Sequence, residues 1–567
     1  MVCDCNSLSS WILRSVVISI SQRARQQSIA ATSFFAPTAT PVSWSSLTTM
    51  NSAYFALRFG RDVAKSLSLN RVVASIPHKS TFLFRSYSSS TMPISESTYK
   101  TIFDAIDARQ EEFVKCLKEA VAIRSVSTEP ERRPDCVKMV EWMKKKLEDV
   151  GAKTQLVENG KQKLHDGRTI DLPPILFAVL GDDPKKKTLL VYGHLDVQPA
   201  YKEDGWNTDP WVLTEIDKKF YGRGSTDDKA PVISWVHVIS VMQQKKIPLP
   251  VNLKFVFECM EEDGSQGLEE ALKKHKDTFL KGVDMTCIAD NYWLGKDKPC
   301  ITYGLRGLCY YFIEISCAKQ DLHSGSYGGS VPEAMTDLVW ILSQLIDKDG
   351  KIKIPGIYDT VAPLTSDEKA LYSKIDFDPE EYRKEIAAHG LLKKTKEEVL
   401  MSRWRDPSLS IHGIEGAFGS PGAKTIIPCK VIGKFSIRIV PNMVPAAVDK
   451  LVINYLNDIW AKHGSPNHFK ASAHHNGMHW LGNYKDHNFQ AGVRAIKRVY
   501  GVEPDYTREG GSIPITLAFQ ELTGKSVMLL PVGAGDDMPH SQNEKMNRSN
   551  FIEGTKMMAA YLLEIAE

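Results

Sequence analysis

Nearly continuous apolar runs alternate with helical stretches from about residue 99 onward. In chain order, the runs are PILFAVLG, TLLVYGHLD, VNLKFVFECMEE, GVDMTCIAD and SVMLLPVGAG. Strands that are apolar along their whole length are covered on both faces, as in a parallel sheet between two layers of helices. Amphipathic helices over residues 99–123 and 134–150 precede the runs. We therefore predict an α/β fold, a three-layer domain with a mainly parallel sheet.

The pattern changes between residues 304 and 477. CYYFIEISC, KFSIRIV and NHFKASAHH read as strands, and two amphipathic helices separate them, PEAMTDLVWILSQLID and PAAVDKLVINYLNDIW. This order approximates a βαββαβ ferredoxin-like unit, with a charged helical excursion over residues 366–401. Because the α/β pattern then resumes, we predict an inserted α+β domain over 304–477, between two parts of the first domain at 93–303 and 478–567.

The first 92 residues differ in composition from the rest. Before Glu96 the acidic residues are Asp4 and Asp62, whereas arginines and lysines are frequent and serine is common. A basic, serine-rich and acid-poor segment is typical of an organellar transit peptide. The alternatives are a disordered extension, or translation that begins near Met92. We expect a cytoplasmic form starting near Met92 and regard mitochondrial targeting of the long form as open.

Bulk composition excludes several classes of protein. A net charge of +3, with 43% hydrophobic and 25% charged residues, gives no sign of a nucleic-acid or membrane partner. No apolar run approaches the roughly 20 residues of a membrane-spanning helix. The ten cysteines form no CxxC pair, which argues against a disulfide framework or a cysteine–zinc site and favours a reducing compartment.

The run TLLVYGHLD ends in His194, and Asp196 follows two residues later. Residues i and i+2 of an extended chain point to the same side, so both side chains should face one cavity. A carboxylate beside an imidazole fixes its tautomer for metal binding or catalysis. A histidine that caps a buried strand is the alternative reading of this short segment.

Four further segments place His or carboxylate side chains after strands or turns, and a crevice at the carboxyl ends of the strands would gather them. These segments supply Asp227 and Asp228, Glu261, Glu262 and Asp263, Asp290, and His540. So many carboxylates cannot be buried together unless cations neutralise them. Histidine and carboxylate without cysteine suit zinc, cobalt or manganese. One bridging carboxylate, with one His and one further carboxylate per ion, would hold two ions about 3.5–4 Å apart around a shared water.

The motifs GHLDVQP, GRGSTDDK, MEEDGSQG, ADN and MPHSQNE, in this order, resemble the dinuclear-metal peptidase family of aminoacylase, carboxypeptidase G and carnosinase. The likeness covers roughly residues 92–567 and is greatest to the nonspecific dipeptidases that cleave Cys-Gly. It implies a homodimeric metallodipeptidase with broad side-chain tolerance and two divalent ions per subunit, Zn²⁺ or Mn²⁺. It also implies that the inserted domain serves dimerisation and acts as a lid.

The resemblance also assigns roles to the residues of these motifs. It makes Asp227 the bridging ligand, with His194 and Asp290 on one metal and Glu262 and His540 on the other. It makes Glu261 the general base and acid, and Asp196 the residue that orients His194.

Outside the metal ligands, the resemblance implies that His323 in KQDLHSGSYGG reaches across the dimer interface and stabilises the oxyanion in the neighbouring active site. It implies substrate contacts from the inserted domain, from TREGGSIP and from two of the metal ligands. These residues are Thr425, Arg438, Glu509, Gly511, Ser512, Asp290 and His540.

Two alternatives to a dipeptidase stay open at this point. One is a hydrolase with the same chemistry, either an N-acyl-amino-acid deacylase or a carboxypeptidase for longer peptides. The other is a metal-binding peptide receptor without turnover. A pure binding protein has no use for Glu261 beside the ligand Glu262, which favours an enzyme.

Overall fold

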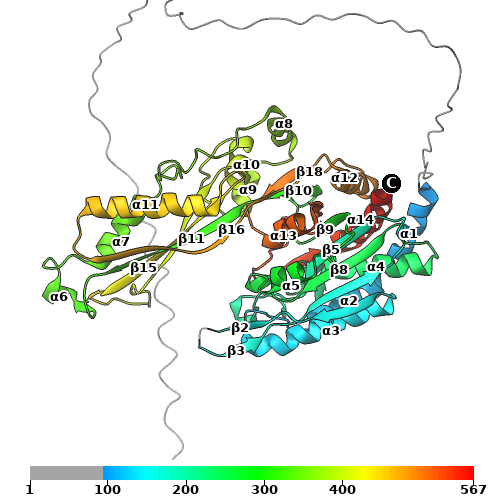
Figure 1. The fold of residues 1–567 in the computed structure, drawn as a ribbon, viewed down its shortest axis with the longest axis horizontal. Helices are drawn as coiled ribbons and strands as arrows, with labels where there is room; N and C mark the ends of the chain where they lie inside the picture. The colour runs from blue at the N-terminus through cyan, green and yellow to red at the C-terminus, as the bar shows by residue number, and fades with distance from the viewer. Residues whose placement is uncertain (1–93, 165) are drawn as a thin grey trace, which may run out of the picture. The chain divides into compact units, whose positions relative to one another are not determined.

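The computed structural model describes residues 94–164 and 166–567. The predictions for the extension at 1–92 lie outside these residues. The described chain opens with helices α1 (Glu96–Ala108), α2 (Gln110–Val121) and α3 (Arg133–Asp149) (Figure 1). The single helix predicted over 99–123 is wrong, because the chain breaks at Arg109, whose φ of −112° is not helical.

A large sheet forms the first layer of structure, in the order β1-β4-β8-β5-β9-β19-β10-β17, with β18 also paired to β10. Its four central strands β8, β5, β9 and β19 are parallel, whereas the outer pairs β1–β4, β4–β8 and β10–β17 are antiparallel. The prediction of a mainly parallel α/β sheet is confirmed. The strands are β1 (Lys153–Val157), β4 (Ile175–Leu180), β5 (Thr188–His194), β8 (Asn252–Glu258), β9 (Met285–Ile288), β10 (Cys300–Leu305), β17 (Trp480–Leu481), β18 (Asp505–Glu509) and β19 (Ser526–Leu529).

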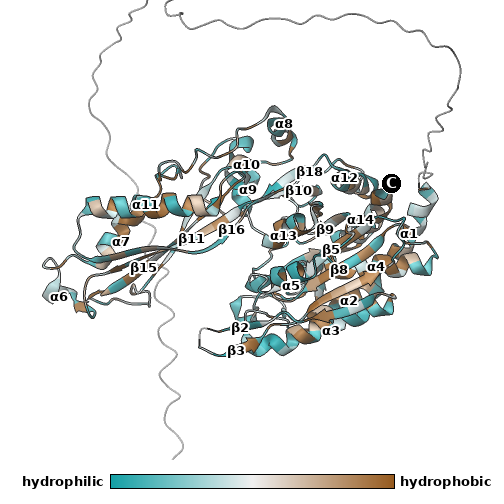
Figure 2. Cartoon of the chain, viewed as in Figure 1, coloured by the Kyte–Doolittle hydropathy of each residue, from teal (hydrophilic) through white to brown (hydrophobic). Residues whose placement is uncertain are grey.

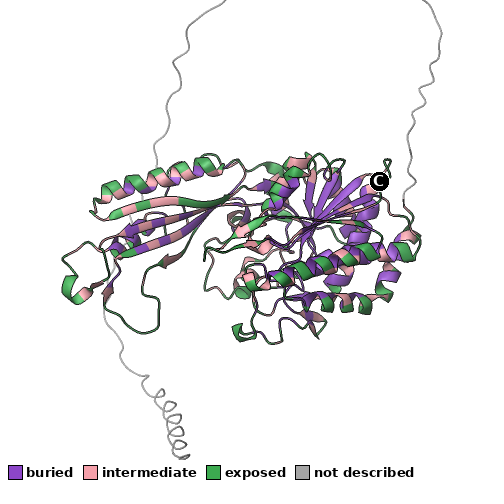
Figure 3. Ribbon diagram, turned by 60° about the horizontal axis from the view of Figure 1, so that its bottom comes forward, coloured by how far each residue is buried: buried purple, intermediate pink, exposed green. Residues whose placement is uncertain are grey.

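Helices cover both faces of this sheet. The ring of Tyr192 on β5 meets Phe519 of α13 (Pro514–Thr523), whereas a Cβ at the next residue, Gly193, would collide with Val232 of α4 (Lys229–Gln244). Consecutive strand residues point to opposite faces, so α13 and α4 lie on opposite sides. Every residue of β5 is buried, as the continuous apolar run predicts, and the central strands are purple in Figure 3.

Two further long helices complete the layer that contains α4. They are α12 (His487–Tyr500) and α14 (Arg548–Ala566), and α14 packs against both α12 and α4. Helix α14 is buried over most of its length, and α4 over nearly all of it. Figure 2 accordingly shows the hydrophobic colour concentrated in α4 and in the neighbouring strands.

A second sheet is antiparallel, in the order β13-β15-β11-β16. Helices α7 (Ala334–Ser343) and α11 (Pro445–His463) pack on one of its faces and share its hydrophobic core. Along β11, buried and half-buried residues alternate. The elements follow the expected ferredoxin-like βαββαβ order, with β13 as the strand that the sequence did not reveal. The strands are β11 (Gly307–Ser316), β13 (Ser408–Glu415), β15 (Lys430–Ile439) and β16 (His468–Gly477).

The charged excursion between α7 and β13 contains α8 (Ser366–Lys374), α9 (Pro379–Glu385) and α10 (Lys396–Trp404). Helices α8 and α10 contact β18 of the large sheet. None of the helices in the described part of the chain is long and apolar enough to cross a membrane.

We propose 303/304 and 477/478 as the boundaries of the insertion, since the strands of the second sheet fall within them.

Candidate metal centre and active site

The carboxyl ends of the central strands bring the predicted ligands together. His194 is the last residue of β5, Asp290 follows β9 by two residues, and Glu262 lies in a 3₁₀ turn (Glu261–Asp263) directly after β8. His540 lies in the loop after β19. Asp227 follows a turn rather than a strand of this sheet, and it lies in the loop between β7 (Lys219–Tyr221) and α4.

Two groups of ligand atoms share Asp227. One group is His194, Asp227 and Asp290, the other is Asp227, Glu262 and His540, and within each group the ligand atoms lie within 4.8 Å of one another. Nε2 of His194 lies 3.1 Å from Oδ1 of Asp227, and Nε2 of His540 lies 3.1 Å from Oδ2 of the same carboxylate. Asp227 therefore presents one oxygen to each group.

The remaining distances complete the two groups. Nε2 of His194 lies 3.5 Å from Oδ1 of Asp290, and Nε2 of His540 lies 3.1 Å from Oε2 of Glu262. Each group thus holds one imidazole and two carboxylates. This donor set fits a divalent cation such as zinc or manganese and does not fit a soft cation that needs thiolates.

The pKa shifts show how much negative charge the protein concentrates here. Burial, followed by the influence of neighbouring carboxylates, raises the pKa of Asp290 to about 6 and that of Glu261 well above its usual value. Burial works in the same direction on Asp227, but His194 and His540 outweigh it and hold the pKa of that carboxyl below its usual value. Hydrogen bonds to Asp227 and Glu262 raise the pKa of His540 to about 11. Such opposed shifts show that carboxylates and imidazoles are packed closely here, where bound cations would take the place of the protons.

Asp196 does more than the sequence predicts. Nδ1 of His194 lies 3.1 Å from the backbone carbonyl oxygen of Asp196 and 3.5 Å from its carboxylate. The same carboxylate accepts hydrogen bonds from the backbone N–H groups of Glu261 at 3.2 Å and Glu262 at 3.0 Å, and from the hydroxyl of Ser127 at 2.5 Å. Asp196 therefore fixes the turn that carries Glu261 and Glu262 as well as the ring of His194.

Two residues that support the site were missed in the sequence. Glu544 is fully buried, pairs with Arg223 at 2.7 Å, and accepts hydrogen bonds from three backbone N–H groups, including that of Asp227 at 3.2 Å. The side-chain N–H of Gln198 donates to Glu262 at 2.7 Å. Both residues lie within the motifs MPHSQNE and GHLDVQP, so their position beside the predicted ligands was the available signal.

The predicted substrate residues form two separate groups. Nη1 of Arg438 on β15 donates to Oγ of Ser512 at 3.1 Å, and that hydroxyl donates to the backbone oxygen of Arg306 at 2.6 Å. Glu509 is the last residue of β18, and Gly511 and Ser512 lie in the segment that follows it. This contact links the inserted unit to the first domain.

His323 and Thr425 form the other group, on a short antiparallel ribbon of β12 (Leu322–His323) and β14 (Ile426–Ile427). The N–H of Ser324 donates to the carbonyl oxygen of Thr425 at 3.2 Å, and His323 is exposed. Within residues 94–164 and 166–567, no hydrogen bond or ion pair joins His323 to the two ligand groups.

An α/β sheet whose carboxyl edge collects imidazoles and carboxylates around one shared aspartate is typical of metal-dependent hydrolases. Residues 190–564 match the model of peptidase family M20/M25/M40. The chain therefore belongs to this family of peptidases, and the resemblance seen in the sequence motifs is confirmed.

Relatives and a solved structure extend the similarity over most of the chain. The Beta-Ala-His dipeptidase of Rattus norvegicus is 49% identical over 477 residues, 84% of this chain and 97% of that protein. The Cys-Gly metallodipeptidase DUG1 of Candida albicans is 48% identical over 466 residues, 81% of this chain and 96% of that protein. The structure of the dipeptidase Dug1p from Saccharomyces cerevisiae has a TM-score of 0.78 at 45% identity and covers 83% of this chain and 99% of that one.

Proposed function

We propose that this chain hydrolyses dipeptides at a divalent-metal centre, with broad tolerance of side chains that includes Cys-Gly. The observation that carries the proposal is the pair of His-and-carboxylate groups that share Asp227. The relatives named as dipeptidases, which match nearly along their whole length, support the substrate class.

We further propose that each subunit holds two divalent ions, either zinc or manganese. His194 and Asp290 would hold one ion, Glu262 and His540 the other, and Asp227 both. When bound, such ions supply Lewis-acid activation of water and of the scissile carbonyl group.

Glu261 is the proposed general base. It lies in the same turn as Glu262, and burial raises the pKa of its carboxyl group well above the usual value, so this group takes up a proton more readily than an exposed glutamate does. Its carboxylate accepts the proton of the attacking water and then passes it to the leaving amine. The hydrogen bonds from the turn to Asp196 hold Glu261 in place for both steps.

Arg438 and Ser512 are the proposed ligands of the substrate's C-terminal carboxylate, together with Thr425, Glu509 and Gly511 along the substrate chain. A guanidinium group binds a carboxylate in a bidentate fashion, and Ser512 already fixes Nη1 of Arg438. Recognition of this terminus would limit the substrates to short peptides.

His323 is proposed to act across a homodimer interface, where its imidazole would donate a hydrogen bond to the oxyanion in the partner's site. Its exposure and its place on a ribbon without contacts to the ligand groups of its own subunit support this assignment. The inserted unit would then make the dimer contact.

A substrate panel tests the proposed function. The metal-loaded enzyme should cleave Cys-Gly, β-Ala-His and Ala-Gly and should leave N-acetyl-methionine intact. Faster cleavage of N-acetyl-methionine would make the chain a deacylase, cleavage of longer peptides a carboxypeptidase, and binding of dipeptides without turnover a receptor. Parallel loading with zinc and manganese would assign the more active ion.

We propose a cytoplasmic location for a form that begins near Met92 and mitochondrial import for the long form. The basic, acid-poor composition of residues 1–92 supports the second location. Reporter fusions of the two forms test this, and identical cytosolic distributions would rule out the import.

A further inference from the structure

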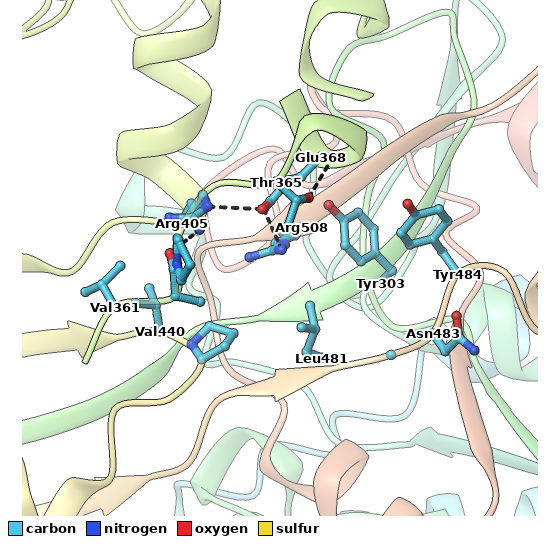
Figure 4. Close-up of a pocket in the computed structure, with 14 residues that line it drawn as sticks. Tyr303, Val361, Thr365, Glu368, Arg405, Val440, Leu481, Asn483, Tyr484 and Arg508 are labelled. Carbon is cyan, nitrogen blue, oxygen red and sulfur yellow. Dashed lines mark hydrogen bonds and ion pairs between the residues drawn. The ribbon is translucent and has the colours of Figure 1, made fainter. Parts of the chain in front are cut away.

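A cavity of about 270 Å³ lies where the two sheets meet (Figure 4). Tyr303 of β10 and Leu481 of β17 line it from the large sheet, and Val440, just after β15, lines it from the inserted unit. Val361 and the start of α8 close another side. None of the residues of the two metal-ligand groups lines this cavity, so it is a separate feature of the described chain.

Three charged side chains form its polar wall. Nη2 of Arg508 lies 2.6 Å from Oε1 of Glu368, and Nε of Arg405 lies 3.2 Å from Oε2 of the same carboxylate, contacts that are dashed in Figure 4. Two guanidinium groups thus share one carboxylate, so the charged groups that line the cavity carry one positive charge in excess; Asp406, next to Arg405 in the chain, does not line it. Only 6% of Arg405 and 9% of Arg508 is exposed, so water screens this excess charge weakly.

A hydrogen-bond donor is left over in the same wall. Nε of Arg508 is buried and has no hydrogen-bond partner within the part of the chain that the structure describes. Oε1 of Glu368 also lacks a hydrogen bond there, but it is ion-paired with Nη2 of Arg508 at 2.6 Å. A buried N–H group without an acceptor costs about 1–3 kcal/mol, and an acceptor that enters the cavity would recover it. The excess charge and the free donor call for the same occupant, an anionic oxygen.

Most of the remaining lining is apolar or aromatic, and Thr365 and Asn483 are its polar exceptions. Val361, Val440 and Leu481 present aliphatic groups. The guanidinium carbon of Arg508 lies 5.1 Å from the centroid of the Tyr303 ring, and the Tyr484 ring stands on the far side of Tyr303 (Figure 4). These groups suit the body of an organic acid and disfavour a small, highly hydrated inorganic anion. The volume lies just below the usual range of small-molecule sites, about 300–1,000 Å³.

We propose that this cavity is a second ligand site, which binds a small monocarboxylate with an apolar body of about the size of one amino acid. The carboxylate pairs with Arg508 and takes the hydrogen bond of its Nε, while the hydrocarbon body packs on Leu481 and Val440. Arg508 directly precedes Glu509 in the segment that ends at Ser512, so the occupant contacts the residue next to the proposed substrate loop. The site does not depend on the proposed function of that loop.

The probe is 4-methylpentanoate, which has a carboxylate and a branched apolar body but no amine. It is titrated into the metal-loaded enzyme by calorimetry, with 4-methylpentan-1-ol and inorganic phosphate as comparison probes. Saturable 1:1 binding of the acid is expected, with affinities at least tenfold weaker for the alcohol and for phosphate.

Variants locate the binding. Leu481→Trp fills the cavity, and Val502→Trp is its control, because the two residues are 41% and 43% exposed and Val502 does not line the cavity. Leu481→Trp and Arg508→Met should each weaken binding at least tenfold, whereas Val502→Trp and Arg438→Met should leave it unchanged. If Arg508→Met does not fold, the pair of tryptophan variants decides alone.

Three results would overturn the proposal. The first is the absence of saturable binding by the acid. The second is binding that survives Leu481→Trp but is lost in Arg438→Met, which would place the acid in the substrate site. The third is equal affinity for the acid and the alcohol, which would reduce the cavity to an apolar pocket without a role for Arg508.

Discussion

Replacing Glu544 with Gln should weaken metal binding without touching a metal ligand. Glu544 is fully buried. Its carboxylate pairs with the guanidinium group of Arg223 and accepts hydrogen bonds from three backbone N–H groups of the loop that ends in Asp227. The amide keeps the shape of the side chain but removes its charge and turns one acceptor into a donor. Arg223, which is 3% exposed, is then buried without a counter-charge.

The expected magnitude follows from these contacts. Breaking one partner of a buried ion pair costs about 3–5 kcal/mol, and the loss of a residue that orients a metal ligand lowers metal affinity about 10–100-fold. Because Asp227 belongs to both ligand groups, both binding steps should weaken together.

The assay is competition with a chromophoric chelator, which yields both metal affinities, and chemical unfolding of the metal-free chain. Glu521→Gln is the matched control, since Glu521 is an exposed residue of α13. Wild-type metal affinities in Glu544→Gln, with unfolding unchanged from the control, would refute the view that Glu544 holds the Asp227 loop in place.

Three further predictions concern catalysis and stability. Glu261→Gln should retain its metal content but lose turnover by at least about 10²-fold, and activity equal to wild type would show that another group is the base. His323→Ala should lower the turnover number by about 10²–10³-fold with metal content unchanged; mixed dimers with Glu261→Gln chains should regain activity, and subunit exchange without recovery would exclude action across the interface. His237 stacks on Phe113 at 4.0 Å, its Nε2 has no partner in the described chain, and burial lowers its pKa from 6.5 to about 3. The folded state therefore binds fewer protons than the unfolded state between these values, so stability falls with decreasing pH by up to about 1.4 kcal/mol per unit. His237→Leu should remove this contribution, and an acid limb as steep as that of wild type in urea unfolding would contradict it.

The sequence predicted the central sheet because its strands are apolar throughout, and strands need this pattern only where helices cover both faces of their sheet. It predicted the convergence of His194, Glu262 and Asp290 because each follows such a strand. It did not reveal β13 in the inserted unit, since SLSIHGIE carries exposed and half-buried residues and lacks a strong apolar period. The break at Arg109 was missed for the opposite reason, because apolar residues continue with helical spacing on both sides of it.

Long-range contacts account for what the sequence could not give. Glu544 lies more than three hundred positions from the loop it holds, and its place in MPHSQNE does not show which backbone groups its carboxylate would bind. The cavity beside Arg508 depends on α8 folding back against β18, which the charged composition of the excursion does not indicate. Such features arise from tertiary packing, whereas the ligand motifs are local and could be read directly.

The central claim is that one carboxylate serves two metal ions, and the metal content of Asp227→Ala tests it most directly. The variant and wild type are loaded with excess zinc, freed of weakly bound metal and analysed for ions per folded chain, with His540→Ala as the comparison because His540 belongs to one ligand group only. The account predicts two ions in wild type, one in His540→Ala and essentially none in Asp227→Ala. Two ions per chain in folded Asp227→Ala would contradict it.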